Sequence, residues 1–91
     1  MNTLLICYDL FHRTPKAYAV LTQGIKELGP WWHEFDSTWF VSTPLTPDEV
    51  RDALNSFLAP GDVLLVLELP PLWWAASGLG PDDTDWLRDR L

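Results

Sequence analysis

The sequence predicts an α+β domain built around one antiparallel sheet. Two segments are short apolar runs of the kind found in strands that are covered on both faces. Two other segments repeat apolar residues at helical spacing. Gly, Pro and Asp residues separate these segments, as they do between regular elements. The length of 91 residues allows a single domain, with a core over residues 1–69 and a C-terminal appendage over residues 70–91.

The chain begins with a predicted strand and helix. Thr3–Leu10 (TLLICYDL) is apolar on both faces, so both faces are expected to be covered. Phe11–Pro15 is expected to be a loop. A helix over Lys16–Leu28 follows, and Gly29-Pro30 predicts its end. Its apolar face combines four residues at helical spacing, Ala17, Leu21, Ile25 and Leu28.

Two short strands are predicted over Trp31–Thr43. Asp36-Ser37 is the expected turn between them, because Asp and Ser side chains bond readily to the nearby backbone. One longer, bent strand is the alternative interpretation of this segment.

A second helix begins with the sharpest local signal in the chain. Thr46 is the expected N-cap, Pro47 stands at the first helical position, and Glu49 completes a capping box. The helix is expected to bury five apolar residues, Val50, Ala53, Leu54, Phe57 and Leu58.

A last strand and a terminal helix complete the predicted fold. Val63–Leu69 (VLLVLEL) is apolar on both faces except at Glu68, and Pro81–Leu91 is expected to be helical. Acidic residues begin this helix and basic residues end it, which complements the helix dipole. Its docking residues are expected to be Trp86, Leu87 and Leu91.

The order of elements is that of a ferredoxin-like βαββαβ sandwich, with an antiparallel sheet, two helices on one face and an added C-terminal helix. Two helices cover only one face of such a sheet. Because the first and last strands are apolar on the other face too, an identical subunit is the simplest cover. The sequence therefore predicts a homodimer with Leu5 and Cys7 at the interface.

Composition narrows the classes of function. Thirteen acidic and six basic residues give a net charge of −7, which opposes sequence-independent binding of nucleic acid. The single cysteine excludes an internal disulfide and fits a cytoplasmic protein, and neither a signal peptide nor a membrane span is predicted. The six tryptophans favour a core or an interface over a base-stacking platform, which normally lies in a basic groove.

Asp9 is the main candidate for chemistry, because it ends the first predicted strand. A carboxylate there can hold a hard cation, and two such carboxylates related by a two-fold axis hold it better. The alternative is that Asp9 caps the following loop. Arg13 and Lys16 flank that loop and are candidates to bind a phosphate. His12 and His33 lack the spacing of metal ligands, so ordinary structural roles are expected for them.

Four strings, LLICYDL, WWHEFDSTWFVST, TPDEVRDAL and DVLLVLEL, resemble the SinR-like proteins and cover nearly all of the chain to Leu69. That group is similar to the small CRISPR-associated ferredoxin-fold family, the partner subunit of the spacer-integration nuclease. Tyr8-Asp9 and Ser37–Phe40 carry this second resemblance, since Ser37–Phe40 resembles that family's Ser-x-Phe hairpin. Trp86-Leu87 also fits the group.

The resemblance implies a ferredoxin-like homodimer in which Asp9 faces its symmetry mate and binds Mg²⁺ or Mn²⁺. Members of the family are described as metal-dependent ribonucleases or deoxyribonucleases, or as scaffolds without activity. This chain departs from the family beside the hairpin, where His33, Glu34 and Asp36 replace basic residues. The departure argues against nucleic acid as a partner.

Three functions follow from these observations. The sequence favours a non-catalytic, homodimeric scaffold or protein-binding module, and the resemblance implies a place in phage defence. A metal-dependent endonuclease acting on RNA or DNA through paired Asp9 carboxylates is the main alternative. The third is an antitoxin-like regulator whose acidic surface neutralises a basic partner.

Overall fold

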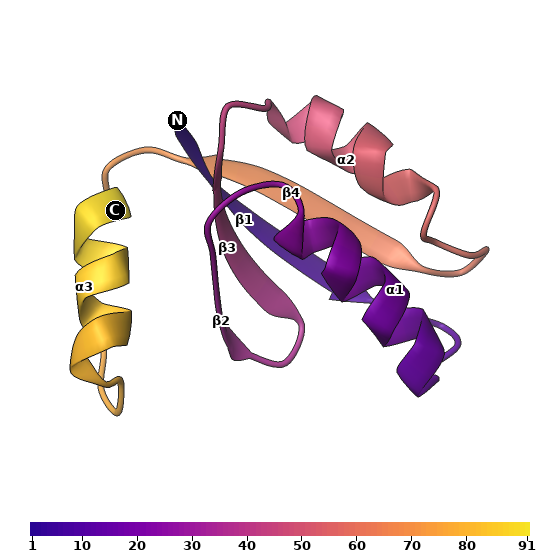
Figure 1. Ribbon diagram of the computed structural model, residues 1–91, viewed down its shortest axis with the longest axis horizontal. Coiled ribbons are helices and arrows are strands. Elements are labelled where there is room, and N and C mark those ends of the chain that lie inside the picture. The colour runs from indigo at the N-terminus through magenta and orange to yellow at the C-terminus, as the bar shows by residue number, and fades with distance from the viewer.

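One sheet organises the chain, and the computed structural model describes all of its residues, 1–91. The four strands lie in the order β2-β3-β1-β4, and every neighbouring pair is antiparallel. Helices α1 and α2 lie side by side over the sheet, while α3 stands apart at the β2–β3 side (Figure 1). The elements are β1 (Asn2–Asp9), α1 (Pro15–Lys26), β2 (Trp31–Phe35), β3 (Thr38–Thr43), α2 (Pro47–Asn55), β4 (Val63–Leu69) and α3 (Pro81–Arg90).

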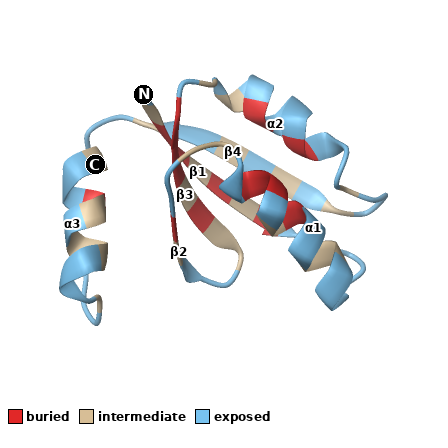
Figure 2. Ribbon diagram, viewed as in Figure 1, coloured by how far each residue is buried: buried red, intermediate tan, exposed pale blue.

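The core lies between the sheet and the two helices α1 and α2. Alternate residues of β1 and β3 point into it, and each helix contributes two of its fully buried side chains (Figure 2). The members that are at most 2% exposed are Leu4, Ile6, Leu10, Leu21, Ile25, Trp39, Val41, Val50 and Leu54. This layer matches the apolar faces that the sequence predicts for the strands and helices.

The first helix is displaced from its expected position. Thr14 is its N-cap and accepts a hydrogen bond from the Ala17 backbone nitrogen, so the helix begins at Pro15 rather than Lys16. It ends at Lys26 rather than Leu28, because the chain must turn there to enter β2. Gly29 makes that turn with φ near +153°, and a side chain at this position would collide with the Ser42 carbonyl.

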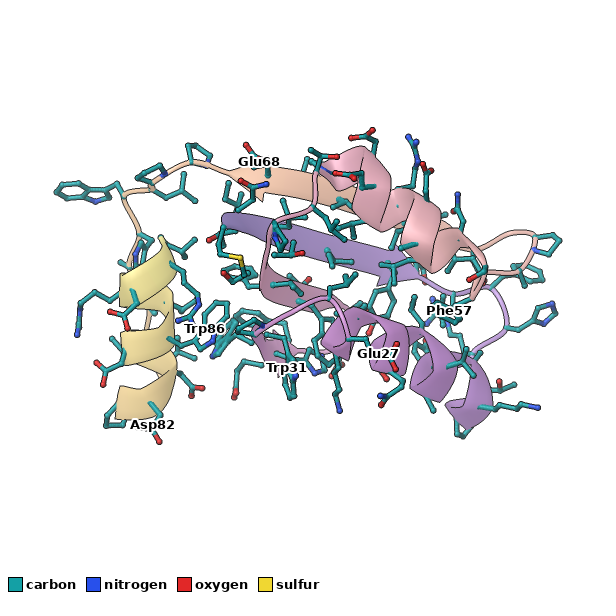
Figure 3. All side chains as sticks on the ribbon, turned by 45° about the horizontal axis from the view of Figure 1, so that its top comes forward. Glu27, Trp31, Phe57, Glu68, Asp82 and Trp86 are labelled. Carbon is teal, nitrogen blue, oxygen red and sulfur yellow. The ribbon has the colours of Figure 1, made fainter.

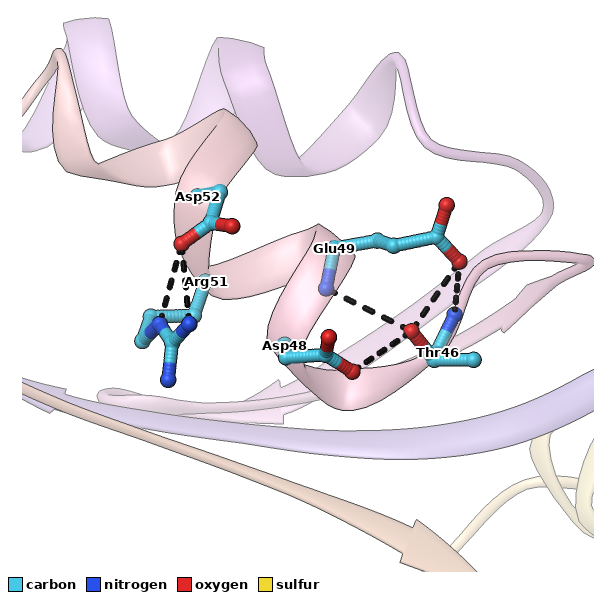
Figure 4. Close-up of polar contacts among 5 residues, drawn as sticks. All are labelled: Thr46, Asp48, Glu49, Arg51 and Asp52. Carbon is cyan, nitrogen blue, oxygen red and sulfur yellow. Dashed lines mark hydrogen bonds and ion pairs between the residues drawn. The ribbon is translucent and has the colours of Figure 1, made fainter.

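The predicted capping box of α2 is confirmed. The Thr46 side chain accepts from the Glu49 backbone nitrogen, and the Glu49 carboxylate accepts from the Thr46 nitrogen at 3.0 Å (Figure 4). The prediction of burial is wrong for two residues of the predicted helix: Ala53 is exposed, and Phe57 is 38% exposed. The helix ends at Asn55, so Phe57 (labelled in Figure 3) lies beyond it, and its ring lies so close to Gly24 of α1 that a side chain at Gly24 would collide with it.

The remaining strand predictions agree closely with the structure. Trp31–Thr43 forms two strands with the turn at Asp36-Ser37, not one bent strand. The last strand spans Val63–Leu69 as expected, and the first is shifted by one residue because Asn2 pairs with Thr43. None of the three helices has both the length and the apolar character needed to cross a membrane.

The far face of the sheet is partly covered by the chain itself. The C-terminal segment packs on the far side of β2 and β3, where ten apolar residues, among them Trp32, Phe40 and Leu87, surround a small hollow of about 210 Å³. Two hydrogen bonds fasten it: Trp32 Nε1 donates to Asp83 at 2.9 Å, and the Thr3 hydroxyl donates to the Arg90 carbonyl at 3.1 Å. A second subunit is therefore not needed to cover this half of the face.

Candidate functional site

Asp9 ends β1 as the sequence predicts, and its side chain is 69% exposed. One carboxylate oxygen accepts a hydrogen bond from Arg13 Nη2 at 2.9 Å, so the two residues form an ion pair. The structure thus brings two of the predicted site residues together. Lys16 is also exposed, on the first turn of α1, but it makes no ion pair with Asp9.

A single chain does not fit a divalent cation at this position. No group of three or more His, Cys, Asp or Glu side chains converges anywhere in the chain. Asp9 is one carboxylate, and Arg13 occupies one of its oxygens with a positive charge that opposes a cation. Any metal site at Asp9 would need a second copy to supply further ligands.

A polar hollow of about 410 Å³ lies between the end of β1, α1 and the β2–β3 turn. Tyr8 crosses its floor: its hydroxyl accepts from Trp39 Nε1 at 3.1 Å and donates to the Asp36 carbonyl at 3.3 Å. Burial raises the pKa of Tyr8 above its ordinary value, although the bond from Trp39 works in the opposite direction. The residues that line the hollow are Tyr8, Arg13, Tyr18, Thr22, His33, Asp36 and Ser37.

The arrangement in this hollow does not assemble a nucleophile with a base. His33 stacks on Trp39 with ring centroids 3.9 Å apart, and its Nε2 lies 3.1 Å from the Asp36 carbonyl oxygen. A carbonyl only accepts, so Nε2 carries the proton in this arrangement and donates it. His33 therefore has the structural role expected from the sequence, and its partners are backbone and an aromatic ring.

The two tryptophans of the first pair, Trp31 and Trp32, pack on opposite faces of the sheet. Trp31 packs on Trp39 at 5.1 Å on the side of α1, where Lys26 lies 5.0 Å from its ring centre. Trp32 is buried on the opposite face and packs on Phe40 at 5.4 Å. These rings hold the hairpin to the helix and to the C-terminal segment. Trp73, in contrast, is fully exposed.

Neighbouring apolar side chains are exposed on the far face of β1 and β4. They belong to the group Leu5, Cys7, Val63, Leu65 and Leu67, which we call the β1–β4 strip. Leu5 pairs with Leu67, and Cys7 pairs with Leu65, so their side chains are neighbours on one face. The three β4 members are 61%, 53% and 44% exposed, while Leu5 and Cys7 are half-buried.

Asp9 belongs to the same face as the strip. Alternation along β1 places it two residues beyond Cys7, opposite Val63. The sequence predicted both the strand end and the apolar alternation. The Asp9–Arg13 ion pair could have been suspected from their spacing of four residues, but the path of the intervening loop decides it.

Comparison with known proteins does not add a relative: no family model, curated protein or solved structure matches the chain.

Proposed function

We propose that the chain is a non-catalytic, homodimeric scaffold that binds other proteins, with a role in phage defence. The β1–β4 strip is the observation that carries this proposal. An apolar surface of neighbouring side chains on a strand pair is unusual in a protein that acts alone, and it marks an interaction site. The strip is bounded at one end by Asp9 and Arg13, which largely neutralise each other.

A second copy of the chain is the occupant that best suits the strip. The two strips have the same length and the same apolar character, and a two-fold axis brings each onto the other. Burial of apolar area stabilises the pair by about 25 cal/mol per Å². Leu5 and Cys7 then lie in the interface, with the exposed leucines of β4 around them.

We further propose that the fold is ferredoxin-like. The antiparallel order β2-β3-β1-β4 and the sequence of elements βαββαβ support this assignment. Under the assignment, α3 and residues 70–80 are an addition that covers the far side of the hairpin. Resemblance to the SinR-like and small CRISPR-associated proteins is the reason for placing the scaffold in phage defence.

The mass of the protein in solution tests the dimer. At micromolar concentration, light scattering is expected to give twice the chain mass of 10.4 kDa. Leu65→Asp places a charge in the proposed interface at a residue that is already 53% exposed, so it should yield a folded monomer. Val20→Asp on α1, which is 39% exposed, is the matched control and should remain a dimer. A wild-type mass of one chain contradicts the proposal.

A metal-dependent endonuclease is the second candidate, and the position of Asp9 on the face of the strip favours it. Face-to-face association about a two-fold axis near Asp9 would bring the two Asp9 side chains together. One carboxylate from each chain would then bind the same Mg²⁺ or Mn²⁺. RNA and DNA cleavage assays with each metal test this candidate. Metal-dependent cleavage that EDTA and Asp9→Asn both abolish supports it. Cleavage that survives Asp9→Asn belongs to another site.

A further inference from the structure

The two edges of the sheet differ in how they are protected. β2 forms one edge; it has five residues, carries His33 and Glu34, and shifts register between Trp32 and Phe35. β4 forms the other edge and pairs only with β1, through a regular register over seven residues. It contains no proline and no bulge, and Glu68 is its one charged residue. An edge of this kind readily accepts another strand.

A groove runs beside the open edge of β4. It lies between the first turns of α2 and the middle of the strand, and it encloses about 370 Å³. Leu64, Leu65 and Val66 line it from the strand, and Pro47, Asp48 and Arg51 line it from α2. Figure 4 labels Asp48 and Arg51 on the first turns of that helix. A strand added at this edge would place alternate side chains into the groove.

The charges along the open edge of β4 favour a cation at Glu68. Arg51 is already paired with its neighbour Asp52 at 3.0 Å. Glu68 is exposed near the end of β4 and has no ion-pair or hydrogen-bond partner (Figure 3). Asp48 accepts a hydrogen bond from the Thr46 hydroxyl at 2.7 Å, which lowers the pKa of its carboxyl and keeps it ionised. The groove lining itself holds one carboxylate, Asp48, and one guanidinium, Arg51, and Arg51 is already paired with Asp52. The unpaired carboxylate of Glu68 lies on the same face of β4 as Leu64 and Val66, in a chain whose net charge is −7.

We propose that the open edge of β4 binds an extended segment of another protein as an added strand. The segment carries Lys or Arg side chains toward α2 and apolar side chains on the side of the strip. Backbone hydrogen bonds supply the affinity, and the unpaired carboxylate of Glu68 favours the cationic residues. The inference rests on the proposed function in one respect: a dimer formed through the strip covers the far face of β4 and not its outer backbone edge, although Leu65 borders both the strip and the groove, so each dimer offers two such sites.

A synthetic peptide tests the edge directly. The probe alternates valine and lysine, has the length of β4, and is blocked at both ends so that only its side chains are charged. Saturable binding to the full chain, with new hydrogen-exchange protection of β4 amides, is expected. The same peptide with glutamate in place of lysine should bind at least tenfold more weakly. N-methylation of the backbone on the paired edge should abolish binding, because it removes the donors of the added strand.

Charge reversal on the protein assigns the site. Glu68→Lys should weaken binding of the lysine peptide roughly threefold to tenfold at low salt, and it should strengthen binding of the glutamate peptide. Glu34→Lys makes the same change at an exposed position on the other edge strand, so it should leave both peptides nearly unaffected. An equal loss in both variants means that the overall charge, not the β4 edge, attracts the peptide, and overturns the inference.

The dimer and the edge site fail in different ways. If the protein has the mass of one chain but binds the peptide, the proposed dimer is wrong and the edge site is supported. A stable dimer that binds neither peptide removes the edge site alone. Equal binding of the N-methylated peptide excludes strand addition. Mass above that of a dimer, reduced by Glu68→Lys, would identify a second copy of this chain as the occupant and overturn the assignment to another protein.

Discussion

The far face of the sheet has two halves that differ in their cover, although both are built from apolar strands. Over β2 and β3, Trp32 is only 6% exposed, because the C-terminal segment packs against it. Over β1 and β4, Leu65 is 53% exposed, and Val63 and Leu67 beside it are also exposed. An apolar strand therefore does not by itself predict burial; the path of a segment far along the sequence decides it.

Polar contacts hold the C-terminal segment where it covers the sheet. The indole of Trp32 on β2 donates to Asp83, and the hydroxyl of Thr3, at the start of β1, donates to the Arg90 carbonyl, so the cover reaches the first residues of β1 as well. Leu65 and Leu67 offer no such donors. A segment of limited length thus settles where it combines apolar burial with satisfied hydrogen bonds, and the other half stays open for a second molecule.

The largest expected effect comes from the face that is covered completely. Leu54 is 1% exposed beneath α2, so Leu54→Asp buries a charge without a partner and should unfold the chain. Phe57→Asp should leave a folded protein, because Phe57 is 38% exposed and lies beyond the helix. Far-ultraviolet circular dichroism compares the two. An unfolded Phe57→Asp variant would show that its contact with Gly24 matters more than its exposure suggests.

An intermediate effect should separate the two halves of the far face. Leu87→Ala removes a residue that is 4% exposed in the covered half, and is expected to cost about 2–4 kcal/mol of unfolding free energy. Leu65→Ala in the open half should cost less than about 1 kcal/mol. Urea denaturation measures the unfolding free energy of both variants. The protein concentration is kept below that at which copies associate. Equal costs would mean that the open half is already covered within one chain.

The smallest effect concerns alkaline pH. Burial raises the pKa of Tyr8 in the folded chain, so the folded state holds this proton more tightly than the unfolded state. Its contribution to stability is fully present below the ordinary value of 10.0 and is lost as pH rises through the higher folded pKa. Thermal unfolding across this range measures the decline. Tyr8→Phe should flatten it, whereas Tyr18→Phe should leave most of it in place, because burial and not the charge of Tyr18 is the largest cause of the raised pKa of Tyr8.

Most of the local structure could be predicted from the residues themselves. Thr46 and Glu49 form the capping box because its bonds join residues three apart, and they need no distant partner. The strand Val63–Leu69 and the turn at Asp36-Ser37 were likewise predicted from alternation and turn chemistry. The class of fold followed from the order of these elements.

The candidate site was less predictable. The sequence placed Asp9 at a strand end, and that position is confirmed. It did not show that Arg13 pairs with Asp9, because a loop of irregular path carries Arg13 back to the strand. Nor did it show the groove beside β4, which combines α2 and a strand that follows it in the chain.

The sequence by itself determined the seven elements, their order and the cap that starts α2, because these depend on contacts between near neighbours. Tertiary structure alone decided which apolar surfaces are covered. Phe57 was expected in the core and lies partly in solvent, whereas Trp32 is buried by residues some fifty positions later in the chain. Periodicity assigns a residue to a face, but burial depends on what distant segment reaches that face, and local spacing carries no information about that.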